Sequence, residues 1–132
     1  ENAEYGFTFL LPAGWKGYTL AKDKWEGTLR NNSGIRRSES GQIINIRHPL
    51  WTEENKRQDI PVMIFTAEQW ELVKNEKMSV GAAPITPKEL GRNNKYIFAL
   101  PARYNFAFLT GYEEVDKIIE DGKLKPFMIS AE

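Results

Sequence analysis

The residues of this chain that could do chemistry are a small mixed set of cations, an imidazole, a carboxylate and aromatic rings. They are Arg47, His48, Trp51, Asp59, Arg103 and Tyr104. Two guanidinium groups would favour a carboxylate or phosphate, because an arginine can hold two oxygens of such a group at once. The rings of Trp51 and Tyr104 would form apolar walls beside them. We interpret this set as the predicted ligand-binding site.

Catalysis by an imidazole would have to use His48, because the chain has a single histidine. In an enzyme, His48 would act as general base while Arg47 or Arg103 held an anionic substrate. No Gly-x-Ser-x-Gly sequence is present, and one histidine among carboxylates is a poor start for a zinc site. The sequence therefore predicts no catalytic residue, metal or cofactor. A structural interpretation is equally open, in which Asp59 pairs with Arg47 or Arg103 and holds the connections together.

Length and composition limit the classes of protein. The 132 residues are predicted to form a single domain over 1–132, and the hydrophobic fraction of 41% with 27% charged residues is typical of a globular chain. Eighteen basic residues balance eighteen acidic ones, so nothing in the net charge indicates a nucleic-acid partner. No apolar run approaches the roughly 20 residues of a membrane helix. The chain has no cysteine, which excludes disulfides, thiol nucleophiles and iron–sulfur clusters.

The elements that must position the candidate site are organised around residues 60–76. Residues 60–65 are apolar on both alternating faces, as in a strand that is covered on both sides. Thr66 and Gln69 can form a capping box that begins a helix, and Trp70 and Val73 share one side of that helix. If strands at 42–47 and 95–100 run antiparallel to 60–66, the six candidate residues gather at one end of the sheet.

The other segments predict a mixed architecture. Residues 5–11 alternate as a half-buried strand, with 15–21 as its hairpin partner. Residues 22–42 are mostly polar and predict a long mobile hairpin or loop, anchored by Trp25 and Leu29. Helix starts are expected at Thr86 and, by a capping box, at Thr110. The predicted fold class is α+β, with a mostly antiparallel sheet flanked by helices.

The opening motif Phe7-x-Phe9-x-x-Pro12-x-x-Trp15 resembles the start of PsbP-like domains. That resemblance implies an antiparallel sheet sandwiched between helices. It covers barely fifteen residues and concerns architecture alone, because nothing in these residues indicates binding to a photosystem.

A second resemblance spans most of the chain. It rests on IRHP at 46–49, QDIP at 58–61, VGAAPI at 80–85 and ALPARYN at 99–105, which together resemble a family of uncharacterised exported bacterial proteins. The family implies an extracytoplasmic location and no particular activity. The chain begins with Glu1 rather than Met, which fits the expectation that a signal peptide has been removed.

These observations together predict an extracytoplasmic ligand- or protein-binding domain whose partner is an anionic small molecule or a protein. A small enzyme that uses His48 is the alternative. A third interpretation is an interaction domain within a larger envelope complex, which an exposed apolar patch would mark.

Overall fold

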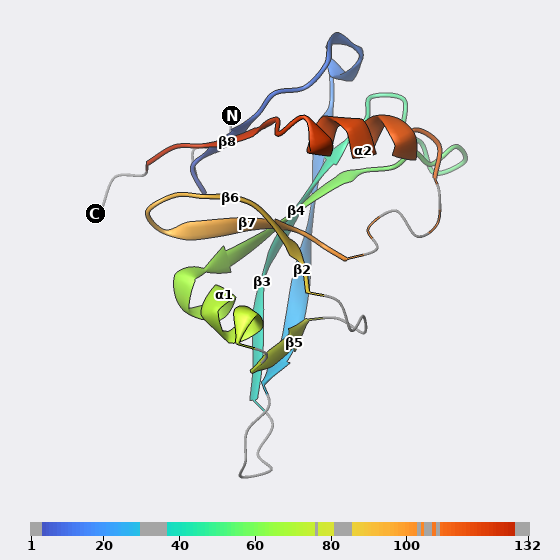
Figure 1. Cartoon of the computed structure of the whole chain (residues 1–132). Coiled ribbons are helices and arrows are strands. Elements are labelled where there is room, and N and C mark those ends of the chain that lie inside the picture. The colour runs from blue at the N-terminus through green and yellow to red at the C-terminus, as the bar shows by residue number, and fades with distance from the viewer. Residues whose placement is uncertain are drawn as a thin grey trace.

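The computed structural model of the chain describes residues 4–29, 37–75, 77–80, 86–102, 104, 107 and 109–128. Within these ranges the elements are β1 (Phe7–Phe9), a 3-10 turn η1 (Ala13–Trp15), β2 (Thr19–Leu29), β3 (Arg37–Arg47), β4 (Ile60–Thr66), α1 (Ala67–Lys74), β5 (Met78–Val80), β6 (Lys88–Arg92), β7 (Tyr96–Leu100), α2 (Tyr112–Glu120) and β8 (Leu124–Pro126) (Figure 1). The chain is therefore a single α+β domain, as the sequence predicts.

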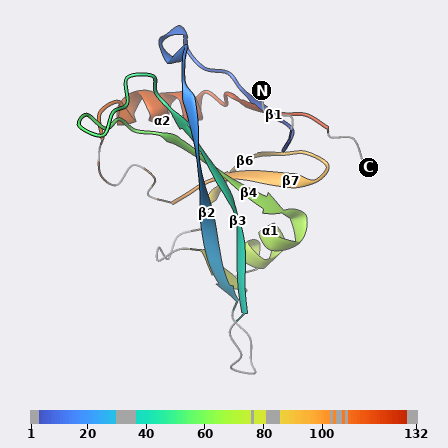
Figure 2. The ribbon, with the colours of Figure 1, turned by 180° about the vertical axis from the view of Figure 1, so that it is seen from behind.

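The main sheet has the strand order β5-β2-β3-β4-β7-β6, and each neighbouring pair in it is antiparallel. β2 and β3 form the longest pair, a twisted ribbon that runs through the height of the molecule (Figure 2). β1 and β8 pair with each other in a separate two-stranded sheet. The strand directions expected for β3, β4 and β7 are confirmed, so the ends that carry the candidate site lie together.

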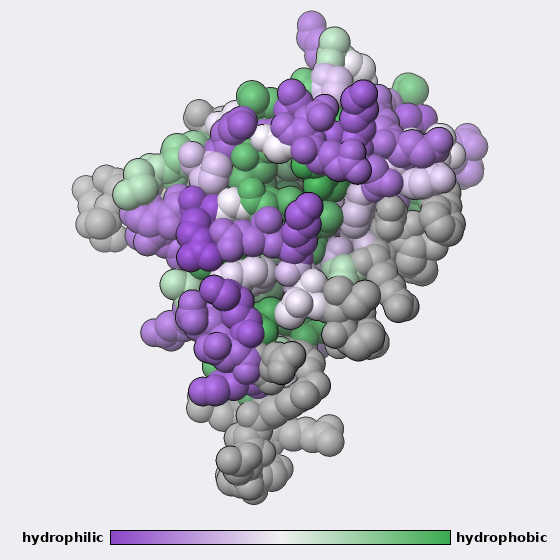
Figure 3. All heavy atoms as spheres, viewed as in Figure 1, coloured by the Kyte–Doolittle hydropathy of each residue, from purple (hydrophilic) through white to green (hydrophobic). Residues whose placement is uncertain are grey.

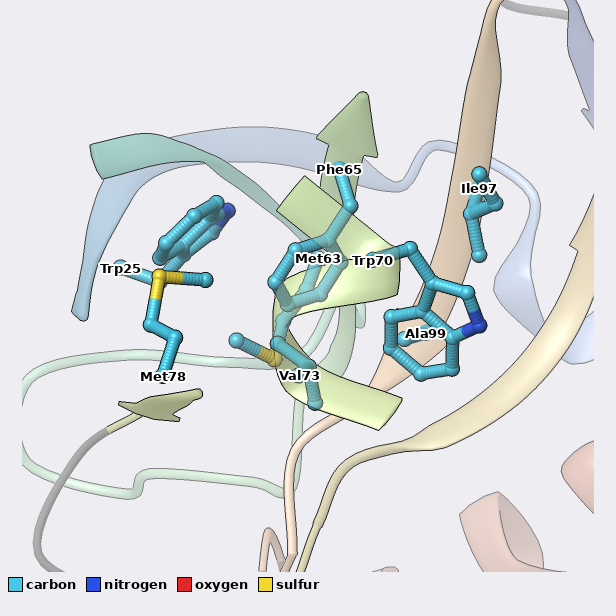
Figure 4. Close-up of a cluster of buried hydrophobic side chains, with 8 residues drawn as sticks. All are labelled: Trp25, Met63, Phe65, Trp70, Val73, Met78, Ile97 and Ala99. Atoms are coloured by element: carbon cyan, nitrogen blue, oxygen red, sulfur yellow. The ribbon is translucent and has the colours of Figure 1, made fainter. Parts of the chain in front are cut away.

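β4 is the centre of the domain because both of its faces are covered. Residues Ile60 to Phe65 are all buried. Met63 and Phe65 point to the face covered by α1, where Trp70 and Val73 pack on them (Figure 4). Thr66 and Gln69 form the predicted capping box, with each side chain accepting the other residue's backbone N–H. The strand-to-helix unit is confirmed as predicted.

The opposite face of the sheet is covered by α2 and the β1–β8 pair. Val62 and Ile64 pack there on Phe7 of β1 and Leu124 of β8. Nearer the site, Trp15 is buried against Ile46 and Ile60 of the sheet and against Val115 and Ile118 of α2. Trp15 thus closes this end of the core.

Trp25 connects β2 to β4 across the strand between them. Its ring stacks on Phe65 with 4.5 Å between centroids, and its indole N–H donates to the Ile64 carbonyl at 2.8 Å. Gly41 of β3 faces Trp25 in the β2–β3 register, and a Cβ at Gly41 would lie 2.3 Å from the indole nitrogen. Glycine at this position therefore leaves the space that the indole ring occupies.

One prediction for the first half of the chain is wrong, and another is confirmed in one of its two forms. The predicted strand 5–11 shortens to β1, and β1 pairs with β8 rather than with residues 15–21. The reason is the turn η1, which carries Trp15 into the core before β2 begins. Residues 22–29 and 37–42 belong to the paired strands β2 and β3, which is the hairpin form of the prediction for 22–42, and Trp25 anchors the hairpin as expected. The remaining part of that predicted loop, 30–36, lies outside the described residues.

Two predictions for helix starts are also wrong. Residues 88–92 form strand β6, because β7 offers an open edge and Asn93 closes the hairpin by accepting the N–H groups of Lys95 and Tyr96. Thr110 caps no helix. Its carbonyl accepts the Gln58 N–H, so α2 begins one residue later after Gly111, whose φ of 83° suits glycine.

The packing of α1 predicts the effect of removing its main side chain. Trp70 is only 5% exposed, so Trp70→Ala should lower the free energy of unfolding by about 3–5 kcal/mol, the usual range for a buried aromatic truncation. Urea unfolding measures this change. A loss well under about 1 kcal/mol would mean that the helix does not cover β4 as described.

The contact between Trp25 and Gly41 gives a second prediction about stability. Gly41→Ala should destabilise the domain by about 1–3 kcal/mol, because the new methyl group overlaps the indole ring. Gly14→Ala is the matched control, since a Cβ at Gly14 meets no atom within 4 Å. Equal stability of the two variants in urea would contradict the placement of Trp25.

Candidate functional site

The candidate site lies where β3 ends and β4 begins. Ile46 pairs with Ile60 across the two strands, so the connection 48–59 leaves and re-enters the sheet at the same end. β7 runs antiparallel to β4 and ends there as well, which brings Tyr104 next to this connection. Five of the six predicted site residues gather here, namely Arg47, His48, Trp51, Asp59 and Tyr104. The sixth, Arg103, lies outside the described residues.

Arg47 is already paired. Its Nε and Nη2 donate to the two carboxylate oxygens of Asp59 at 3.2 and 3.0 Å, and its guanidinium carbon lies 3.8 Å from the centroid of a Trp51 ring. The side chains of Arg47 and Asp59 are 28% and 19% exposed, so the pair is largely covered. This pairing is the structural alternative that the sequence left open. The charge of Arg47 is neutralised, which weakens it as a holder of anions.

His48 is buried and is held in one orientation. It is 7% exposed, its ring meets Trp15 edge-on at 4.8 Å between centroids, and its Nδ1 accepts the Leu50 N–H at 3.0 Å. Burial lowers the pKa of His48 below its ordinary value, and the charge of Arg57 lowers it further, while Glu114 opposes them. A neutral imidazole whose Nδ1 accepts a hydrogen bond carries its proton on Nε2. Neither ring nitrogen then has a free lone pair for use as a base.

Tyr104 and Gln58 tie the connections together. Tyr104 donates its hydroxyl hydrogen to Asp116 of α2. Burial raises the pKa of Tyr104, and the hydrogen bond and charge of Asp116 raise it further, so the phenol stays protonated. The Gln58 side chain is buried and donates to the carbonyls of Asp59 and Tyr104 at 3.0 and 3.2 Å. These contacts fix the shape of the site around the charged residues.

Arg57 is a member of this cluster that the sequence analysis missed. Its Nε is buried and has no hydrogen-bond partner. The guanidinium group lies against the turn before α2, since a Cβ built on Gly111 would come within 3.3 Å of Nη2. The charge of Arg57 also lowers the pKa of His48. In the ranges that the structure describes, the ion pairs are Arg47–Asp59 and Arg92–Glu89, so Arg57 has no carboxylate partner there.

The sequence carries no local signal for Arg57. It stands in a polar connection next to Lys56, as an ordinary surface residue would. Only the backbone β-bridge between Arg57 and Thr110, which is far along the chain, shows where Arg57 lies. Glu114 was missed for the same reason. It accepts the Trp15 indole N–H at 2.9 Å and approaches His48 from α2.

A separate hollow lies between β6 and the end of α2. It is lined by Lys88, Glu89, Leu90, Ile119 and Leu124 among others. Figure 3 shows polar side chains along α2 and along the β6–β7 hairpin, with apolar atoms visible between them. None of the predicted site residues lines this hollow.

No protein-family model matches this chain, and neither curated proteins nor solved structures give a significant match. Among the described residues, no helix has the length and apolar character needed to cross a bilayer. The same part of the chain holds no group of three or more side chains suited to bind a metal ion. The case for a function therefore rests on the geometry of the site.

The environment of His48 predicts a pH dependence. Because folding lowers its pKa below the ordinary value of 6.5, the folded state binds this proton less readily than the unfolded chain. The stability that His48 contributes is complete above about pH 6.5 and is lost as the pH falls through the lower folded pKa. Wild type should therefore lose stability on acidification relative to His48→Asn, whose side-chain oxygen can still accept the Leu50 N–H.

Urea unfolding of both proteins at about pH 5 and about pH 8 measures this difference, because the carboxylates titrate in both and cancel. An NMR titration of the His48 ring gives the pKa directly. A value above 6.5 would contradict the buried neutral imidazole.

Proposed function

We propose that this domain is a binding module that takes an anionic group, a carboxylate or a phosphate, at the end of the sheet where His48 lies. The observation that carries this proposal is the buried Nε of Arg57, which has no acceptor. The proposal keeps the predicted ligand class and moves the principal cation from Arg47 to Arg57. The extracytoplasmic location implied by the family resemblance is part of the same proposal.

An unsatisfied buried donor favours such a ligand energetically. Leaving a buried donor without an acceptor costs roughly 1–3 kcal/mol, and more when the group is charged. A carboxylate or phosphate would remove that cost, and it could engage Nε together with a terminal nitrogen of the guanidinium group. Neighbouring Arg47 already holds the Asp59 carboxylate through Nε and Nη2, so it supports the site as a wall with Trp51 rather than as a second clamp.

The alternative function, an enzyme with His48 as general base, has less support. The lone pair on His48 Nδ1 is engaged by the Leu50 N–H, and Nε and Nη2 of Arg47, the pair that could hold a substrate carboxylate, are engaged by Asp59. A substrate would have to displace both sets of hydrogen bonds before any proton could move. Binding without chemistry requires neither displacement, and we prefer it for that reason.

A thermal-shift screen of small carboxylates and phosphates, followed by titration, tests this proposal. Arg57→Gln should weaken binding of the stabilising anions by at least about tenfold, the loss of one charge-assisted contact. The fold should tolerate this change, because no hydrogen bond to Nε is lost. Titration of Arg103→Ala tests in the same way whether Arg103, the other predicted cation of the site, contributes to binding.

Arg92→Gln is the matched control. Arg92 is paired with Glu89 on β6 and belongs to no part of the candidate site, so anion affinity should not change. The proposal is wrong if no anion stabilises the protein, or if Arg57→Gln binds the anions as tightly as wild type does.

A further inference from the structure

Among the described residues, the outer edge of β2 is paired only near its end. β5 pairs with Gly27, Thr28 and Leu29 only, and no described residue pairs with 19–26 on that side. β3 occupies the other side of β2 throughout. A strand edge of this kind presents unpaired N–H and C=O groups and can accept a further strand.

An apolar hollow adjoins this edge. Leu20 and Tyr18 line it and are 49% and 40% exposed, and Ile44 and Ile46 of β3 form its floor. Phe9 of β1 and Leu11, two residues after it, close the hollow on the other side. Leu20 lies opposite Ile46 in the β2–β3 register, so the hollow is on the same face of the sheet as α2. A strand added to β2 could place an apolar side chain next to Leu20 at the mouth of this hollow.

The charges along the edge select the kind of strand. Lys22 and Lys24 alternate with Asp23, so both lysines are on the face of Leu20 and Asp23 is on the other face. Glu26, at the end of the stretch 19–26, shares the face of the lysines, and all four charged side chains are exposed. Two side chains of opposite charge that face each other on neighbouring strands stabilise the strand pairing, and two side chains of like charge destabilise it.

We propose that the β2 edge binds an extended acidic segment of a partner protein, by addition of a strand to the sheet. In the antiparallel sense, the segment reads acidic residue, any residue, acidic residue, any residue, apolar residue. The two acidic side chains then face Lys24 and Lys22, and the apolar one faces Leu20. This surface is distinct from the Arg57 site and does not depend on it.

The same charges disfavour a second copy of this chain as the occupant. The two longest symmetric antiparallel pairings of the open stretch are centred on Asp23 or on Lys22. The first places Asp23 against itself and Lys22 against Lys24, and the second places Lys22 against itself. Each pairing opposes like charges at its centre, which an acidic partner avoids.

The test uses a synthetic peptide that contains Glu-Lys-Glu-Thr-Leu, with its binding followed by calorimetry and by hydrogen exchange of β2. We expect binding together with slower exchange of alternate amides within 19–26. The charge-reversed variant Lys22→Glu/Lys24→Glu should bind this peptide at least about tenfold more weakly, because two attractive cross-strand pairs become repulsive. A peptide with Lys-Glu-Lys-Thr-Leu should in turn bind the variant better than it binds wild type.

Two controls separate this surface from others. Lys88→Glu/Lys125→Glu carries the same change in net charge at exposed positions on β6 and β8, and it should bind the peptide as wild type does. Arg57→Gln should also leave peptide binding unchanged. Peptide binding at β2 and anion binding at Arg57 can therefore succeed or fail independently. N-methylation of alternate peptide amides should abolish binding, since strand addition requires backbone hydrogen bonds.

The proposal is overturned by any of four results. These are no binding at about millimolar peptide, binding without protection of β2, equal loss of affinity in the Lys88/Lys125 control, and concentration-dependent protection of β2 without peptide. The last result would identify a second copy of the chain as the occupant of the edge.

Discussion

The contact of Trp25 with β4 across Gly41 is the interaction on which the arrangement of the sheet depends. The pairing of β3 with β4 extends only to Ile43 and Met63. Beyond it, the Trp25 side chain of β2 passes Gly41 of β3 and donates to the Ile64 carbonyl of β4. The same ring stacks on Phe65, which α1 covers through Trp70. The β2–β3 ribbon, the central strand and the helix are thus joined at one point. Without it, the lower part of the ribbon would be held mainly by the short strand β5.

At the other end of the ribbon, Arg47 and Arg57 differ in whether a carboxylate neutralises their charge. Arg47 and Arg57 lie at the same end of the sheet, yet one is neutralised by Asp59 and the other has a buried nitrogen without an acceptor. The neutral His48 sits close to Arg57, and a nearby cation disfavours its charged form. The proposed anion site rests on this contrast between a guanidinium group that is paired with a carboxylate and one that is not.

The open edge of β2 shows how one charge pattern can serve two purposes. Lysines on an exposed edge are a common protection against pairing between identical strands. Lys22 and Lys24 act in this way here, because self-pairing opposes like charges. The same lysines favour pairing with an acidic strand. The charges that disfavour pairing between two copies of β2 therefore also favour an acidic partner. The apolar hollow beside Leu20 adds the buried contact that backbone pairing alone would lack.

The sequence by itself determined the features that depend on neighbours along the chain. The doubly covered strand at 60–65, its capping box and the gathering of residues 47–59 follow from local periodicity and from one short connection between adjacent strands. The tertiary structure decided the rest, because distant residues supply the hydrogen-bond partners. Residues 88–92 follow a local sequence signal for a helix start at Thr86, yet pairing with the edge of β7 makes them a strand. Arg57 forms a β-bridge with distant Thr110 and its Nε is buried without an acceptor, and no pattern of adjacent residues carries that information.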